Sequence, residues 1–99
     1  MEKEYIERKF RVIEDKRHQS YVEHKLTDVL ILIMSAVLCG LDGLAEIVGH
    51  AKNRAEFFRI NYGIQEIPSK PTMSRILNML DGDALSKVII EIMKKERTL

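Results

Sequence analysis

The feature that most constrains this chain is a 14-residue apolar segment, residues 26–39, which is interrupted only by Thr27, Asp28 and Ser35. Gly40 follows the segment and is suited to end a helix, because glycine adopts the left-handed conformation that a helix C-terminus often needs. A strand of this length without a turn signal would be unusual, since most strands have about four to eight residues. The segment therefore predicts a buried central helix.

The same segment is too short to cross a membrane. Asp28 and Asp42 enclose 13 residues, which span about 20 Å as an α-helix. The hydrocarbon core of a bilayer is about 30 Å thick and needs roughly 20 residues. Residues 1–25 are of mixed charge and do not resemble a signal peptide. With 45% hydrophobic and 31% charged residues, the chain has the composition of a globular domain, and we expect it to be cytoplasmic.

Periodic apolar residues predict further helices on both sides of the central segment. Residues 3–14 place apolar side chains about one turn apart and predict the first helix, which a polar link over residues 15–20 follows. Side-chain oxygens that can accept from free N–H groups predict the starts of four later helices: Asp42, Asn53, Ser69 and Asp81. Pro71 suits the first turn of the helix that starts after Ser69. Gly63 suits the end of the preceding helix, which starts near Asn53.

These patterns together predict an all-α fold. No segment alternates with period two, and Asp81-Gly82 lies between helical patterns rather than between strands. We expect one domain over residues 1–99, with an N-terminal helix and link over 1–25 and a helical core over 26–96. The domain is a compact bundle of five or six short helices around a buried central helix, and residues 43–80 form a helix-turn-helix-like unit.

The predicted core contains large apolar residues from every part of the bundle: Leu30, Ile33, Val37, Ile47, Phe57, Ile76, Leu77, Leu80 and Ile89. Phe58 and Ile60 are expected to face inward beside Phe57. Cys39, which ends the apolar segment, is expected to be a small core residue.

The residue types that carry catalysis or bind metals in other proteins form no catalytic or metal-binding pattern in this sequence. One cysteine and three histidines lack metal-ligand spacing, and we expect His18, His24 and His50 to be solvated. Asp42 and Asp81 are explained as helix caps, and no phosphate-binding glycine motif is present. The sequence predicts a protein without catalytic residues, metal, cofactor or small-molecule substrate.

Positive charge is concentrated in residues 50–80, which carry five basic and two acidic residues, and this points to DNA. In a helix-turn-helix protein, the start of the second helix meets base edges while basic side chains nearby contact phosphates. The candidate DNA contacts are Lys70, Thr72, Ser74 and Arg75, with Arg54 and Arg59 as supporting phosphate contacts. An ordinary exposed helix also has a polar face, and the pattern alone favours that simpler interpretation.

Several segments occur in the order and spacing typical of one family: residues 15–17, Tyr21, residues 25–30, residues 36–40 (Ala-Val-Leu-Cys-Gly), Glu46-Ile47, residues 67–69, Thr72, residues 75–77 and Leu80-Asp81. Over residues 12–95 the chain resembles the N-terminal, DDE-transposase-associated domain of the H-repeat-associated insertion-sequence transposases. The combination of residues 36–40 with the later Pro-Ser-x-x-Thr-x-x-Arg, residues 68–75, is the most specific part of this resemblance.

The resemblance implies a non-catalytic helical module that assists DNA binding in transposition. In that family the module precedes a catalytic domain with three acidic residues and divalent metal, and no such domain is found before the chain stops at Leu99. The resemblance therefore implies a truncated or split transposase. The alternative is a structural module that packs against the catalytic domain, or against a second copy, without binding DNA.

Overall fold

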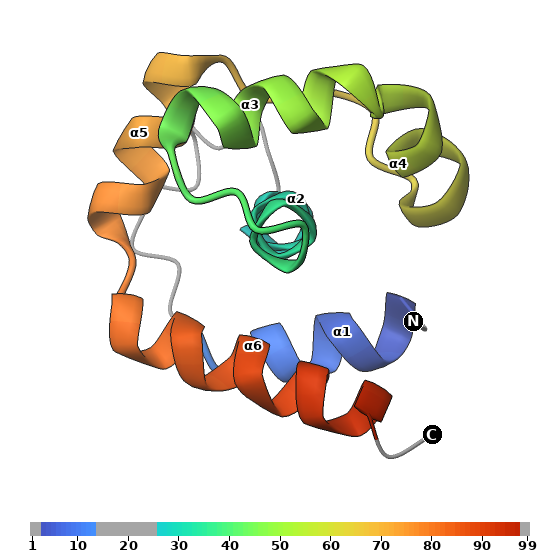
Figure 1. Cartoon of the computed structure of the whole chain (residues 1–99), viewed down its shortest axis with the longest axis vertical. Helices are drawn as coiled ribbons and strands as arrows, with labels where there is room; N and C mark the ends of the chain where they lie inside the picture. Colours follow the sequence, from blue (N-terminus) through green and yellow to red (C-terminus); the bar gives the residue numbers. More distant parts are fainter. Residues whose placement is uncertain (1–2, 14–25, 98–99) are drawn as a thin grey trace.

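Within residues 3–13 and 26–97, which are the residues that the computed structural model describes, the chain forms six α-helices and no strand (Figure 1). Their bounds are α1 Lys3–Phe10, α2 Leu26–Leu38, α3 Leu44–Asn53, α4 Ala55–Tyr62, α5 Lys70–Met79 and α6 Gly82–Arg97. The predicted all-α class is therefore confirmed. The predicted link at 15–20 lies outside the described residues, as do His18 and His24.

α2 lies in the middle of the molecule and is seen end-on in Figure 1. α3 packs on one side of α2, and the neighbouring helices α1 and α6 form the other side. α5 contacts α3 and leads down into α6, so it closes the left side of the view. The buried residues of α2 occupy every side of the helix, as expected for a helix enclosed by protein: Leu26, Val29, Leu30, Ile31, Leu32, Ile33, Met34 and Ala36. The central buried helix is confirmed.

The end of α2 follows the predicted glycine signal. Gly40 has φ of 81°, and its N–H donates to the carbonyl of Val37 at 2.9 Å while the N–H of Leu41 donates to that of Ala36 at 2.9 Å. This pair of bonds is the Schellman motif, which satisfies the last carbonyls of a helix. The same turn corrects two core predictions, because Val37 is 40% exposed and Cys39 is exposed. The last two residues of α2, Val37 and Leu38, are exposed, whereas residues 29–34 are buried.

α4 buries less of its surface than the sequence predicted. Phe58 is fully buried, but Phe57 is 49% exposed and Ile60 is 66% exposed, so their predicted inward positions are wrong. α4 packs mainly against α3, and an eight-residue helix with one main neighbour can bury only one stripe of side chains. Gly63, with φ of 68°, ends the helix as predicted.

Two of the four predicted helix caps are confirmed. The side chain of Ser69 accepts from the N–H of Thr72 at the start of α5. The carboxylate of Asp81 accepts from the N–H groups of Asp83 at 3.0 Å and Ala84 at 3.3 Å at the start of α6. Each side chain satisfies N–H groups that the first helical turn leaves without a backbone partner.

The other two predicted caps are wrong by one residue. Gly43 is the N-cap of α3, so Asp42 lies just outside the helix, and Gly43 forms no side-chain cap bond. α3 continues through Asn53 and meets α4 at Arg54, which is the N-cap of α4. A single residue between two helices leaves Asn53 inside the first helix, where it cannot cap the second.

The remaining core predictions are confirmed fully or in part. Leu30, Ile33, Ile47, Ile76 and Ile89 are buried in one cluster, and the partly buried Leu77 and Leu80 pack against it. No helix in the described part of the chain is both long and apolar enough to span a bilayer.

Candidate nucleic-acid interface

The first turn of α5 is organised by a chain of side-chain hydrogen bonds. Ser69 Oγ donates to Thr72 Oγ1 at 3.0 Å and accepts from the backbone N–H of Thr72 at 3.4 Å. Arg75 Nη2 also donates to Thr72 Oγ1, at 3.2 Å. These hydrogen bonds place the Arg75 guanidinium beside the first turn of the helix, where it adds positive charge to the N-terminal end of the helix dipole.

The start of α5 also differs from the other described helices in its charge. Each of the other five helices carries an acidic residue in its first turn, namely Glu4, Asp28, Glu46, Glu56 and Asp83. α5 carries none, and its first residue is Lys70. Because an acidic side chain in the first turn would offset the positive end of the helix dipole, α5 is the described helix in which no such side chain offsets it.

The solvent face of α5 carries the predicted side chains. Met73 and Ile76 are buried and hold the inner face against the core, where α5 packs against α3. On the outer side, Lys70 and Arg75 are exposed, and Thr72 and Ser74 are half-buried. The structure thus brings these four residues onto one short helix.

The two supporting residues lie elsewhere. α4 and α5 occupy opposite ends of α3 (Figure 1), so Arg54 and Arg59 are separated from the α5 group. Arg59 pairs with the carboxylate of Glu56 one turn earlier on the exposed face of α4. Arg54 stands at the junction of α3 and α4 and lines a shallow pocket of about 520 Å³.

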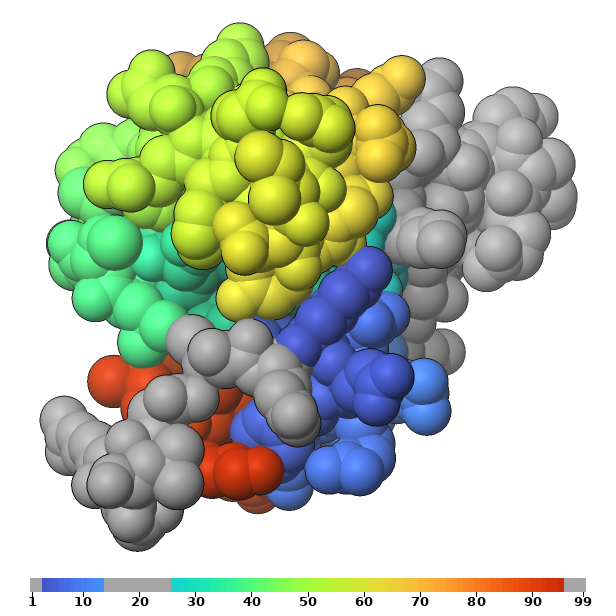
Figure 2. All heavy atoms as spheres, turned by 90° about the vertical axis from the view of Figure 1, so that its right-hand side faces the viewer, coloured from blue at the N-terminus to red at the C-terminus, as the bar shows by residue number. Residues whose placement is uncertain are grey.

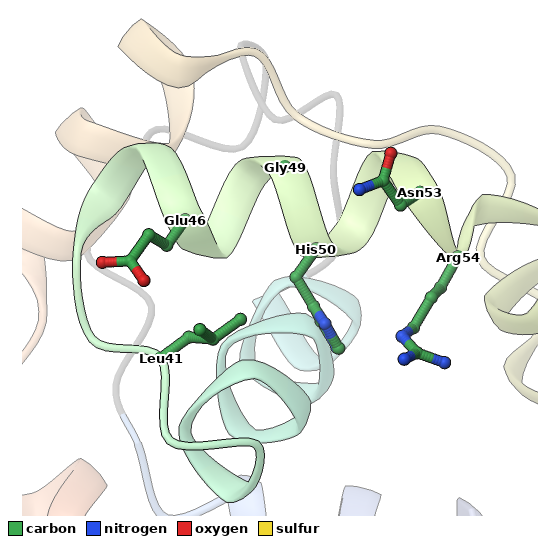
Figure 3. A pocket seen from close by; sticks show the side chains of 6 residues that line it. All are labelled: Leu41, Glu46, Gly49, His50, Asn53 and Arg54. Carbon is green, nitrogen blue, oxygen red and sulfur yellow. The ribbon is translucent and has the colours of Figure 1, made fainter.

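The same pocket is lined by His50, which the sequence predicted to be solvated. Figure 3 shows His50 extending from α3 toward α2 and Arg54 extending in a similar direction from the end of α3, while the Glu46 carboxylate points away from His50. His50 is only 9% exposed. Its Nε2 lies 3.0 Å from Ser35 Oγ. Its ring packs edge-on against the Phe58 ring, with the two ring centroids 6.2 Å apart. The prediction of a solvated His50 is therefore wrong.

Burial lowers the pKa of His50, and the positive charge of Arg54 lowers this pKa further. Two sequence signals could have indicated the buried position. Ile47 and Ala51 place His50 on the apolar face of its helix, and Ser35 interrupts an otherwise buried segment in which a hydroxyl needs a partner.

No group of three or more His, Cys, Asp or Glu side chains within residues 3–13 and 26–97 is arranged to hold a metal ion. On the α5 surface, the ammonium of Lys70, the hydroxyls of Thr72 and Ser74 and the guanidinium of Arg75 can recognise anions and polar groups.

A comparison with protein families matches residues 7–93 to the family described as DDE_Tnp_1-associated. The curated "Putative transposase YncI" of Escherichia coli O157:H7 is 37% identical over 86 residues, which cover 85% of this chain and 22% of that protein. The "H repeat-associated putative transposase YhhI" of Escherichia coli K12 is 31% identical over 85 residues, which cover 84% of this chain and 22% of that protein. The chain thus spans about a fifth of the length of these relatives. No solved structure matches it significantly.

Proposed function

Because this chain belongs to the DDE_Tnp_1-associated family, we propose that it is a non-catalytic, DNA-binding module that serves an insertion-sequence transposase. The relatives named as transposases support the context of transposition. The observation that carries the DNA-binding part is the start of α5, which has Lys70 as its first residue, an exposed Arg75, and no acidic residue in its first turn.

In this proposal α5 acts as the reading helix of a helix-turn-helix-like unit. The Lys70 ammonium, at the positive end of the helix dipole, contacts a phosphate. Ser74 and Thr72 supply hydroxyls for the backbone or groove edge, and Arg75 reaches a base, since arginine donates well to guanine in the major groove. α3, packed against the inner face of α5, holds the reading helix in place.

Arg54 and Arg59 are supporting phosphate contacts in the same proposal. They lie on a separate surface at the other end of α3, so they meet a different stretch of nucleic acid from the one that α5 contacts. Strand cleavage and joining require an acidic, metal-dependent catalytic domain, and we propose that this module works together with such a domain.

A second candidate function is favoured by the exposed apolar side chains of α4. Phe57 and Ile60 stand one turn apart with about half or more of their surface in solvent, as expected where another protein domain docks. In this alternative the module packs against a transposase catalytic domain and has no direct contact with DNA.

Titration of the folded protein with a labelled mixed-sequence duplex at low salt tests the proposal. The DNA-binding function predicts saturable binding in the micromolar range or tighter, which is typical of non-specific protein–DNA contacts. If no binding is detected at tens of micromolar protein while circular dichroism shows an intact helical fold, the DNA-binding function is refuted and the docking alternative stands.

A further inference from the structure

We propose that α4 carries a second nucleic-acid site, in which an unpaired DNA base stacks on Phe57 and a neighbouring phosphate binds Arg54. This inference rests on the proposed DNA-binding function only in that DNA is the ligand, because the site is separate from α5. Figure 2 shows the α4 region at the surface of the molecule, directly above the start of α1.

The Phe57 ring is held in place by other rings while much of it stays open. It packs edge-on against Phe58, with ring centroids 5.4 Å apart and ring planes at 80°. Its centroid lies 6.2 Å from that of the Tyr62 ring. Phe58 is fully buried, so this contact ties Phe57 to the core, yet 49% of Phe57 remains exposed. A ring that is fixed by its neighbours loses little conformational freedom when a base stacks on it.

Cations lie near both ends of α4. Arg54 comes one turn before Phe57 and is exposed, as is Lys52. Among the described residues, no carboxylate forms an ion pair with either of them, whereas the Glu56 carboxylate forms an ion pair with Arg59. At the far end of α4 the Lys3 ammonium lies beside Gly63. The α4 surface thus has excess positive charge on both sides of its apolar centre.

This combination fits single-stranded nucleic acid better than a duplex. Aromatic side chains beside cations form the stacking sites of single-strand binding proteins. A paired base within a duplex has both faces covered by its neighbours and cannot reach the ring. Ile60, one turn beyond Phe57, extends the apolar surface along which the single-stranded nucleic acid lies.

The test measures fluorescence anisotropy of a short labelled oligo(dT) with the full chain and variants of Phe57. We expect Phe57→Ala to weaken binding about fivefold to a hundredfold, the range that loss of one stacked base gives. Phe57→Tyr retains a flat ring and should bind like the wild type. Phe57→Leu keeps an apolar side chain of similar bulk without a stacking face and should bind as weakly as Phe57→Ala. Ile90→Ala is the matched control, because Ile90 on α6 is also 49% exposed.

The outcomes separate this inference from the proposed function of α5. If Phe57→Leu binds oligo(dT) as tightly as the wild type, or if the wild type does not bind it, the stacking site is refuted, and sedimentation then shows whether α4 is a self-association surface. Arg75→Ala should lower duplex affinity without changing oligo(dT) affinity. A protein that binds oligo(dT) through Phe57 but ignores duplex DNA would refute the role of α5 and leave the α4 site standing.

Discussion

The hydroxyl of Ser35 in α2 lies 3.0 Å from Nε2 of His50 in α3, so a polar pair joins the central helix to the helix that supports the proposed reading helix. Buried apolar residues neighbour each member of this pair along its helix, namely Ile47 and Ala51 beside His50 and Met34 and Ala36 beside Ser35. Apolar contacts tolerate sliding of one helix along another, whereas a hydrogen bond is satisfied in one register only. The pair therefore fixes how α3 sits on α2.

Removing the hydroxyl should destabilise the protein. Ser35→Ala leaves Nε2 of His50 without its partner, and an unsatisfied polar group of this kind costs about 1–3 kcal/mol. Urea denaturation followed by circular dichroism measures the loss in the free energy of unfolding. Ser86→Ala is the control, because Ser86 is exposed on α6, and it should change stability by less than about 0.5 kcal/mol. Equal stabilities of the two variants would contradict the structural role of the pair.

The same histidine predicts how stability depends on pH. The pKa of His50 in the folded state is lowered below its ordinary value of 6.5 by burial and by Arg54, so the unfolded chain binds a proton at this residue more readily than the folded one. The contribution of His50 is therefore complete above about pH 6.5 and decreases as the pH falls from there toward the folded-state pKa. Denaturation midpoints over this range test the expectation. His50→Gln should flatten this part of the profile, and an unchanged profile would contradict it.

The central helix makes the strongest prediction about the core. Leu30 is fully buried in α2, and Leu30→Ala should cost about 2–5 kcal/mol because the truncation leaves a cavity. Ile33→Ala should behave similarly. Ile90→Ala removes an apolar side chain that is half in solvent and should have a much smaller effect. If Leu30→Ala left the melting midpoint unchanged, α2 would not be the centre of the fold.

The parts of the fold that local signals control could be predicted from the sequence. The apolar segment at 26–39, Gly40 and Gly63 at helix ends, and Ser69 and Asp81 at helix starts all act through the residue itself and its nearest neighbours along the chain. Their physical effects, such as a left-handed φ or a capping oxygen, do not depend on where other helices lie. For this reason these predictions are confirmed.

Apart from the caps at Asp42 and Asn53, which are wrong by one residue, the errors occur where tertiary packing decides. Val37 and Phe57 have the residue type and spacing of core positions, but the end of α2 and the outer side of α4 have no helix over them within the described part of the chain. His50 is polar, yet its burial depends on Ser35, which is 15 residues away. At the candidate interface, the placement of Lys70, Thr72, Ser74 and Arg75 on one helix could be predicted because it follows from their positions along the chain. The position of Arg54 and Arg59 at the opposite end of α3 could not.

Arg75 should affect which DNA sequences bind. If its guanidinium reaches a base edge, Arg75→Ala should weaken binding to preferred duplexes by about 1–3 kcal/mol and weaken the preference at that position. Anisotropy titrations with a panel of duplexes measure both effects. If Arg75 serves only to bond Thr72 at the start of α5, the variant should lower the melting temperature and leave the relative affinities of the panel unchanged.

The salt dependence of duplex binding tests the central claim most directly, because it counts phosphate contacts. The affinity for a mixed-sequence duplex is measured over a range of salt concentrations for the wild type, for Lys70→Ala at the start of α5, and for Lys94→Ala. Lys94 is an exposed lysine in the last part of α6. We predict a steep log–log slope for the wild type and for Lys94→Ala, and a slope about one unit shallower for Lys70→Ala, with affinity lowered for all sequences alike. A wild-type affinity that does not depend on salt, or equal slopes for all three proteins, would contradict DNA binding by the start of α5.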